Sequence, residues 1–338
     1  MELIFPQKLK KGDTIAIVSP SGGLAGLVPH RLDNAIKFLK SLGLNIKEYP
    51  CTRKTSGWES APAKERAKDL MAAFTDKDVK GIICSIGGCN ANKILKYLNY
   101  EEIRANPKAF CGYSDASVIH YALFNVSGLS TYYGPALMTQ FGEFPRPLEY
   151  TVEHFKKAML ENQDIGKIKP SKEWTDEVLD WFEKKDLERP RRLKCNPGYE
   201  WLREGTAKGQ IIGGCISSII HLIGTDYWPN HSGKILFLEN PEGEDFTAGE
   251  PLSNVDALLA DLDNAGIFRE IRGLVFGRAF GYSEEERMKL QEIILDNTKD
   301  YDFPILYGVD IGHSDPQITI PLGAEVEIDS EENLFEFL

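Results

Sequence analysis

Short apolar runs alternate with longer stretches of helical apolar spacing through the first half of the chain. The apolar runs, rich in β-branched residues, cover residues 14–18, 45–49, 81–86, 109–113 and 129–133. The amphipathic stretches that follow them cover residues 31–42, 63–74, 91–98, 117–124 and 148–160. This alternation predicts an α/β fold with a doubly wound, mostly parallel sheet that helices cover on both faces.

The second half of the chain has a different pattern. Runs typical of strands or helices cover residues 209–215, 216–223, 234–238, 253–265, 273–276, 284–297 and 304–307. Residues 324–328 and 333–338 are predicted to form a closing hairpin-like pair. Strands and helices follow one another less regularly here, so a smaller α+β domain is expected.

Between these halves, from 162 to 193, the regular spacing is lost. The segment is polar and acidic and carries Trp174 and Trp181. Two roles fit the tryptophans equally well: packing the segment onto a domain, or stacking on a planar group of a substrate. The pattern predicts three parts, an N-terminal α/β domain, a connecting loop and a C-terminal domain, at residues 1–165, 166–195 and 196–338.

Three loops lie where predicted parallel strands end, at 19–23, 87–90 and 112–115. Open sheets of this kind bind ligands at the carboxyl ends of their strands. The paired glycines in the first two loops fit neither the dinucleotide nor the P-loop pattern, so no cofactor is predicted. They serve equally well as turn residues or as places where backbone lies close to a ligand.

Composition limits the classes of protein. The 338 residues are 42% hydrophobic and 27% charged, values typical of a globular protein with room for two cores. No run of about 18 apolar residues occurs, and the N-terminus lacks a secretory pattern. Six cysteines without a C-x-x-C pair indicate reduced core residues. We expect a cytoplasmic protein with no membrane partner.

Charge and histidine spacing exclude further classes. The net charge of −12 argues against nucleic-acid binding. The basic run 189–194 follows an acidic segment and is interpreted chiefly as a solvated linker, with binding of an anionic substrate as the weaker alternative. The six histidines show no paired spacing, so no metal site is predicted.

Ser114 lies at a predicted turn from a buried strand into a helix. Such a turn exposes a hydroxyl, and the free N–H groups that begin the helix can bind a developing oxyanion. Ser114 or Asp115 can instead simply cap the helix. Because Gly-x-Ser-x-Ala lacks the last glycine of the usual nucleophile elbow, this stretch alone favours the cap.

Two further residues complete a possible catalytic set. Glu239 ends an apolar strand, and His313 lies in a loop bounded by glycine and proline. With Ser114 they would form a Ser-His-Glu triad, in which the histidine takes the serine proton and the glutamate orients the imidazole. Residue types alone leave this set open, since a chain of this length contains such a trio by chance.

The motifs around these residues resemble the LD-carboxypeptidase and microcin C immunity family of serine peptidases. The matching blocks, in the family's order, are 11–20, 85–88, Gly112-Tyr113-Ser114-Asp115, 205–215 with Gly224-Thr225, Leu236-Phe237-Leu238-Glu239, and 312–323 with the pattern G-H-x-x-P-Q-x-T-I-P-x-G. The resemblance spans nearly the whole chain. It implies Ser114 as nucleophile, His313 as general base and Glu239 as its orienting partner.

The resemblance also implies an oxyanion hole, formed by the backbone N–H groups of Gly88 and Asp115, and a homodimer that needs no metal. The tryptophan segment and residues 196–205 look closer to the microcin C immunity branch. Its members cut aminoacyl-nucleotide conjugates, so Trp174 or Trp181 is expected to bind the base. The alternative is the branch that trims the terminal D-alanine from murein tetrapeptides. A non-catalytic receptor for small molecules stays open as a different class.

Overall fold

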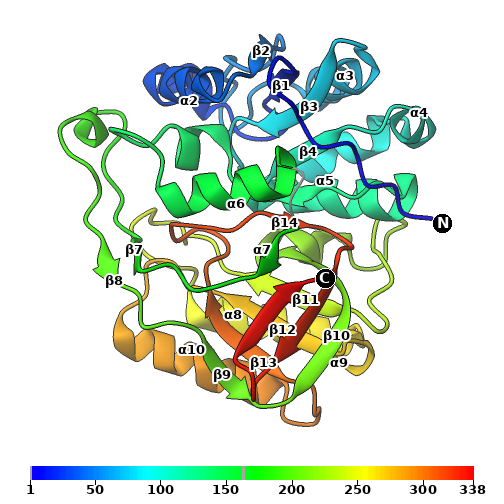
Figure 1. The fold of residues 1–338 in the computed structure, drawn as a ribbon, viewed down its shortest axis with the longest axis vertical. Coiled ribbons are helices and arrows are strands. Elements are labelled where there is room, and N and C mark those ends of the chain that lie inside the picture. The colour runs from blue at the N-terminus through cyan, green and yellow to red at the C-terminus, as the bar shows by residue number, and fades with distance from the viewer. Residues whose placement is uncertain (1, 162–163) are drawn as a thin grey trace.

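Two sheets, one above the other in Figure 1, form the frame of the protein. The structure is a computed structural model that describes residues 2–161 and 164–338. Met1, and Asn162 and Gln163 at the start of the predicted irregular segment, lie outside the described residues. The N-terminal part, blue to green, forms most of the upper unit, and the later part of the chain, from green to red, forms most of the lower one.

The upper sheet has the strand order β14-β5-β4-β3-β1-β2. Its strands are β1 (Thr14–Val18), β2 (Asn45–Glu48), β3 (Val79–Cys84), β4 (Ala109–Gly112), β5 (Tyr132–Tyr133) and β14 (Ile320–Pro321). The pairs from β2 to β5 are parallel, as the strand-helix alternation predicts, and only β14 pairs antiparallel. Because β14 comes from the far end of the chain, the last part of the sequence completes the first sheet.

The lower sheet has the order β6-β16-β15-β10-β11-β12-β13-β9. Its strands are β6 (Gly166–Lys167), β9 (Glu200–Arg203), β10 (Thr206–Cys215), β11 (Ile235–Glu239), β12 (Gly273–Gly277), β13 (Ile305–Val309), β15 (Glu325–Asp329) and β16 (Leu334–Phe337). The four strands β10 to β13 are parallel, and antiparallel strands extend them on both sides. The sequence pattern did not predict β6 or β9.

Helices pack on both faces of the upper sheet and against one face of the lower sheet. They are α1 (Leu24–Leu27), α2 (Pro29–Ser41), α3 (Ala63–Thr75), α4 (Tyr100–Ala105), α5 (Ser117–Ala122), α6 (Glu149–Met159), α7 (Ile216–Ile219), α8 (Leu252–Asn264), α9 (Ile267–Glu270) and α10 (Glu284–Asn297). Shorter 3₁₀ or π turns cover Ala91–Tyr97, Ser114–Ala116, Leu123–Ser127, Leu137–Phe141, Lys185–Leu187 and Ile220–Leu222. Residues 91–98 were predicted as an α-helix, but the structure has a 3₁₀ helix there, Ala91–Tyr97.

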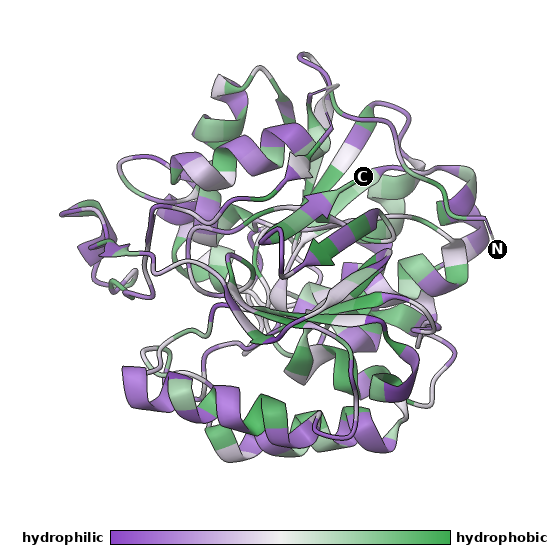
Figure 2. Cartoon of the chain, turned by 60° about the horizontal axis from the view of Figure 1, so that its bottom comes forward, coloured by the Kyte–Doolittle hydropathy of each residue, from purple (hydrophilic) through white to green (hydrophobic). Residues whose placement is uncertain are grey.

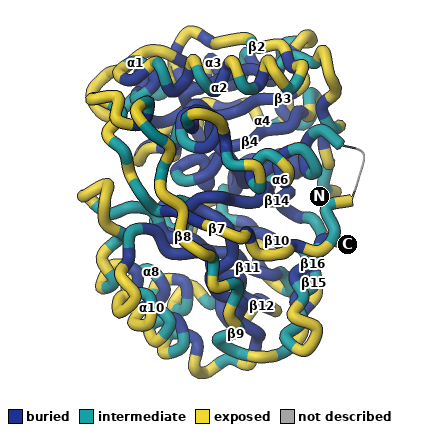
Figure 3. Tube along the Cα trace, turned by 60° about the vertical axis from the view of Figure 1, so that its left-hand side comes forward, coloured by how far each residue is buried: buried dark blue, intermediate teal, exposed yellow. Residues whose placement is uncertain are grey.

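Burial follows the hydropathy of the sequence. The central strands are dark blue in Figure 3, whereas much of α10 and both residues of β8 (Lys194–Cys195) are exposed. In Figure 2 the helices show green and purple residues side by side, as amphipathic helices do. One buried cluster joins the two units, since Tyr113 and Tyr133 of the first pack with Phe237 and Val309 of the second. The interface between the units is therefore built like a core.

The connecting segment, residues 166–195, runs along the left side of Figure 1. It contains a small antiparallel pair, β7 (Glu173–Trp174) with β8. Its stem is held by Asp310, whose carboxylate accepts hydrogen bonds from the hydroxyl and N–H of Ser171 and lies 3.3 Å from the amide nitrogen of Asn196. The segment is thus tied at both ends to the lower unit.

Candidate active site

Ser114 lies just after β4, at the carboxyl edge of the upper sheet. Its φ of 61° is in the left-handed region, which a non-glycine residue adopts at a cost and which is typical of strained functional turns. The Gly87 backbone packs so closely that a Cβ there would lie 2.8 Å from Ser114 Oγ and 3.5 Å from the Asp115 nitrogen. The turn at 87–88 therefore faces the serine, where a donor to an oxyanion is needed.

His313 and Glu239 reach Ser114 from the lower unit. His313 Nε2 lies 3.0 Å from Ser114 Oγ, and His313 Nδ1 lies 2.7 Å from Glu239 Oε2. Glu239 is fully buried at the end of β11, and the His313 side chain is 7% exposed. The three residues are far apart in sequence, yet they form one hydrogen-bonded chain with the geometry of a serine-hydrolase triad.

Acidic neighbours control the protonation of His313. Burial lowers its pKa, but the carboxylates of Glu239, Glu242 and Asp315 outweigh burial and raise the pKa to about 9. The nearest carboxylate outside the triad is Glu242, whose Oε2 lies 3.5 Å from His313 Nε2. Glu242 is partly exposed, so its charge is available to a ligand at the same place. The tyrosine ring of Tyr113 packs against the imidazole at 4.9 Å.

The Asp115 side chain does not cap its own helix, and neither does Ser114, so the cap favoured by the local sequence is wrong. The carboxylate instead accepts hydrogen bonds of 2.7 Å from the N–H groups of Asn90 and Ala91, and another from the Ser21 hydroxyl. It thereby caps the 3₁₀ helix that begins at Ala91. Asp115 thus ties the three strand-end loops together and fixes the backbone around Gly88.

Neither predicted substrate-binding tryptophan presents an open ring. Trp174 is buried, with Lys194 Nζ 4.7 Å and Arg278 Cζ 5.1 Å from its ring centre. Trp181 is half-buried, and the Arg31 guanidinium lies 4.4 Å from its ring centre. Stacking on the ring faces that these cations occupy would require the cations to move aside. The substrate-binding role of both tryptophans stays a prediction.

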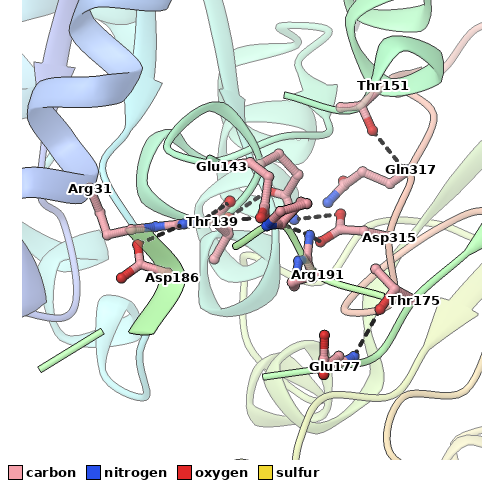
Figure 4. Close-up of polar contacts among 12 residues, drawn as sticks. Arg31, Thr139, Glu143, Thr151, Thr175, Glu177, Asp186, Arg191, Asp315 and Gln317 are labelled. Atoms are coloured by element: carbon pink, nitrogen blue, oxygen red, sulfur yellow. Dashed lines mark hydrogen bonds and ion pairs between the residues drawn. The ribbon is translucent and has the colours of Figure 1, made fainter. Parts of the chain in front are cut away.

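A buried ionic network, shown in Figure 4, fastens the connecting segment. We call it the fastening network; its members are Arg31, Glu143, Asp186, Arg191 and Asp315. Arg191 lies between Glu143 and Asp315, at 2.8 and 2.7 Å. Arg31 pairs with Asp186 at 3.2 Å. The interpretation of 189–194 as a solvated linker is therefore wrong for Arg191, because its charge is neutralised inside the protein.

The network also contacts the loop that carries His313. The backbones of Thr175 and Asp315 exchange hydrogen bonds of 2.6 and 2.9 Å, and Gln140 donates to the Asp315 carboxylate at 3.0 Å. The sequence patterns gave no role to Asp315, Glu242 or Tyr133, and for Arg191 they offered only its place in the basic run 189–194. Only the position of Asp315, two residues after His313, hinted at a role.

Within the described ranges 2–161 and 164–338, no group of three or more His, Cys, Asp or Glu residues could hold a metal ion. Over the same ranges, no helix is long and apolar enough to cross a membrane. Each of the six cysteines is a free thiol.

The chain is similar to known proteins over nearly its whole length. Models described as the LD-carboxypeptidase N-terminal and C-terminal domains match residues 15–134 and 208–328. The chain is similar to the microcin C7 self-immunity protein MccF of Escherichia coli, 30% identical over 95% of this chain and 92% of that protein. It is also similar to a probable murein peptide carboxypeptidase of Bacillus subtilis (strain 168), 28% identical over 97% of this chain and 92% of that protein.

A solved structure of MccF in complex with aspartyl sulfamoyl adenosine has the same fold. Its TM-score is 0.90 at 29% identity, covering 99% of this chain and 98% of that chain. The predicted α/β fold with two units, and the family resemblance read from the motifs, are thereby confirmed.

Proposed function

The chain belongs to the LD-carboxypeptidase family and is a serine peptidase, and from this premise we propose that Ser114, His313 and Glu239 are its catalytic triad. The observation that carries the proposal is the unbroken chain of hydrogen bonds, 3.0 Å from Ser114 Oγ to His313 Nε2 and 2.7 Å from Nδ1 to Glu239. The two units bring these three side chains together, and a serine-hydrolase site accounts for that arrangement.

The proposed reaction is acyl transfer to Ser114. His313 takes the serine proton as Oγ attacks the carbonyl carbon, and Glu239 holds the imidazole in the required tautomer. The backbone N–H groups of Gly88 and Asp115 are proposed to bind the oxygen of the tetrahedral intermediate. His313 then protonates the leaving nitrogen. In the second step His313 takes a proton from water, which attacks the acyl-enzyme and releases Ser114.

The proposed substrate is an aminoacyl-nucleotide or a related small conjugate with an amide-type bond, whose cleavage would give self-immunity or detoxification. Similarity to MccF, whose solved structure holds aspartyl sulfamoyl adenosine, supports this class. Glu242 supports it independently, because an aminoacyl group carries an ammonium next to its scissile carbonyl. A carboxylate 3.5 Å from His313 Nε2 lies within reach of that ammonium.

The same contact weighs against the alternative substrate, a murein tetrapeptide. In that peptide the nitrogen next to the scissile L-centre carbonyl is acylated and uncharged, so it would not pair with Glu242. An ammonium bound there would also cancel part of the charge that raises the pKa of His313 to about 9, which would free the base at neutral pH.

The test offers purified enzyme three compounds side by side: an aminoacyl sulfamoyl adenosine, its N-acetylated form and a murein tetrapeptide. We expect turnover of the first, weak turnover of the second and none of the third. The Ser114→Ala enzyme should lose about 10⁴-fold or more in kcat. Turnover of the tetrapeptide alone would replace the substrate class, and full activity of Ser114→Ala would remove the nucleophile.

We further propose that the protein acts in the cytoplasm as a homodimer. Six free cysteines among the described residues suit a reducing compartment. Light scattering on the purified protein measures the mass in solution, and a monomer at micromolar concentration would contradict the dimer. Cell fractionation tests the compartment, and recovery in an exported fraction would contradict it.

A further inference from the structure

Tyr133 lies between the two units, beside the strand that delivers Ser114. It is fully buried in β5, where it stands opposite Gly112 of β4 and Ile320 of β14. Its neighbour Tyr132 is also buried but belongs to the cluster on the other face of the sheet, because side chains alternate along a strand. Only Tyr133 therefore faces the lower unit.

The Tyr133 hydroxyl makes two hydrogen bonds with residues of the triad. It lies 2.5 Å from Glu239 Oε1 and 3.3 Å from the backbone nitrogen of Ser114. An N–H can only donate, so the hydroxyl accepts from Ser114 and its own proton is directed to Glu239. Burial and the adjacent carboxylate raise the pKa of Tyr133 well above its ordinary value, so it remains a donor.

Glu239 depends on this contact. Its side chain is excluded from solvent, and its other oxygen accepts from His313 Nδ1. The backbones of Gly277 and Gly312 pack against it so tightly that a Cβ on either would overlap the glutamate side chain. A carboxylate held in this way cannot turn to find water, and a buried charge without a donor is costly.

Ser114 depends on it as well. The left-handed backbone at Ser114 aims the hydroxyl at His313, and the Tyr133 oxygen holds the N–H of that residue in place. Since this N–H is engaged, it is not free to serve an oxyanion, which leaves that task to the N–H groups at Gly88 and Asp115.

We propose that Tyr133 is a positioning residue of the catalytic site, which fixes the Glu239 carboxylate and the Ser114 backbone relative to each other across the two units. The proposal rests on the proposed triad and deepens it. Tyr133 does not touch the reacting atoms, so its effect passes through Glu239 and Ser114.

The test compares Tyr133→Phe with Tyr132→Phe, a matched control that removes a hydroxyl from the same strand on the opposite face. A fluorophosphonate probe measures the reactivity of Ser114 without any assumption about the substrate. Loss of a hydrogen bond to a charged group should slow labelling by Tyr133→Phe about tenfold to a hundredfold. Tyr132→Phe should label within about twofold of wild type, and thermal unfolding checks that both variants fold.

A pH profile of labelling separates positioning from a general loss of packing. The charged groups that face His313 are Glu239 on β11, Glu242 on the loop after it and Asp315 on its own loop. Without the tyrosine donor, more of the Glu239 charge acts on His313, so the acid limb of the Tyr133→Phe profile should move to higher pH. Packing loss alone would leave the limb in place.

Each outcome decides one proposal. Labelling of Tyr133→Phe at the wild-type rate with an unchanged pH profile, or equal losses in both variants, would overturn the role of Tyr133. If wild type labels but no conjugate is turned over, the proposed substrate fails and the role of Tyr133 is still measured. If Tyr133→Phe does not fold, an NMR titration of His313 in wild type and Tyr133→Met, whose side chain is smaller than tyrosine and has no O–H or N–H donor, replaces the labelling profile, and equal pKa values would overturn the proposal.

Discussion

Two buried polar clusters meet on the loop that carries His313 and Asp315, and they are built differently. In the triad cluster, formed by Ser114, His313, Glu239 and Tyr133, each Glu239 oxygen has a single donor. In the fastening network, carboxylates have several partners: Asp315 accepts from both Arg191 and Gln140, and Glu143 pairs with two arginines.

The two clusters therefore have different roles: the triad cluster sets the geometry of the catalytic groups, and the fastening network holds segments of the chain together. A cluster with one donor per oxygen holds a defined direction, which proton transfer requires. A network of opposed charges holds segments together, and removing one member leaves its partners buried and unpaired. We therefore expect losses in the triad cluster to reduce turnover at nearly constant stability, and losses in the fastening network to reduce stability first.

The largest effect is expected for Glu239→Gln. The amide keeps the size of the side chain but cannot hold the imidazole as a carboxylate does, so kcat should fall about 10³-fold to 10⁴-fold. Urea unfolding is measured at about pH 10, above the His313 pKa of about 9, where the imidazole is neutral in both enzymes. There the free energy should lie within about 1 kcal/mol of wild type, since the amide replaces the carboxylate without a change of size. A variant that is much less stable but retains turnover would contradict the role of Glu239 in geometry and would place it with the stabilising residues.

In the fastening network, Arg191→Met should lower the free energy of unfolding by about 3–5 kcal/mol, because Glu143 and Asp315 lose a buried cation. The matched control is Arg189→Met in the same basic run. Arg189 pairs with Glu177 at 2.7 Å but is exposed, so its loss should leave the free energy of unfolding close to that of wild type. Equal costs in urea unfolding would show that burial of Arg191 does not matter.

The pH dependence sharpens the role of charge at the triad. A general base must be neutral, so kcat/KM should rise with pH and level off above the His313 pKa of about 9. Glu242→Gln removes one charge that raises this pKa, so the acid limb should move down by about one pH unit, since Glu242 is partly exposed. The profile is measured with the N-acetylated aminoacyl sulfamoyl adenosine, which has no ammonium to pair with Glu242. A limb that stays in place would contradict the contribution of Glu242.

The smallest effect is expected for Trp181→Leu. The Arg31 guanidinium covers this ring, so the variant should lose about 1 kcal/mol of stability. Because the ring is covered, KM for an aminoacyl sulfamoyl adenosine should change less than about threefold. A tenfold rise in KM without loss of stability would instead support the predicted stacking of Trp181 on the substrate.

The strongest local patterns predicted the elements well. Helix α10 has the predicted bounds, and α2, α3, α6 and α8 differ from their predicted bounds by one or two residues. In these segments the amphipathic spacing predicts both that a helix forms and which of its faces is buried. The strand ends at Gly112 and Glu239 and the loop at His313 were also readable, since each motif is contiguous in sequence.

Contacts between distant residues were not readable. The sequence by itself determined the α/β order, the family and the three residues proposed as a triad. Only the tertiary structure decided that Tyr133 joins Glu239 to Ser114, that Asp115 caps a helix other than its own, and that Arg191 lies between two buried carboxylates. The physical reason is that a hydrogen bond or ion pair depends on which groups the packed sheets bring within about 3 Å, and no local periodicity encodes that distance.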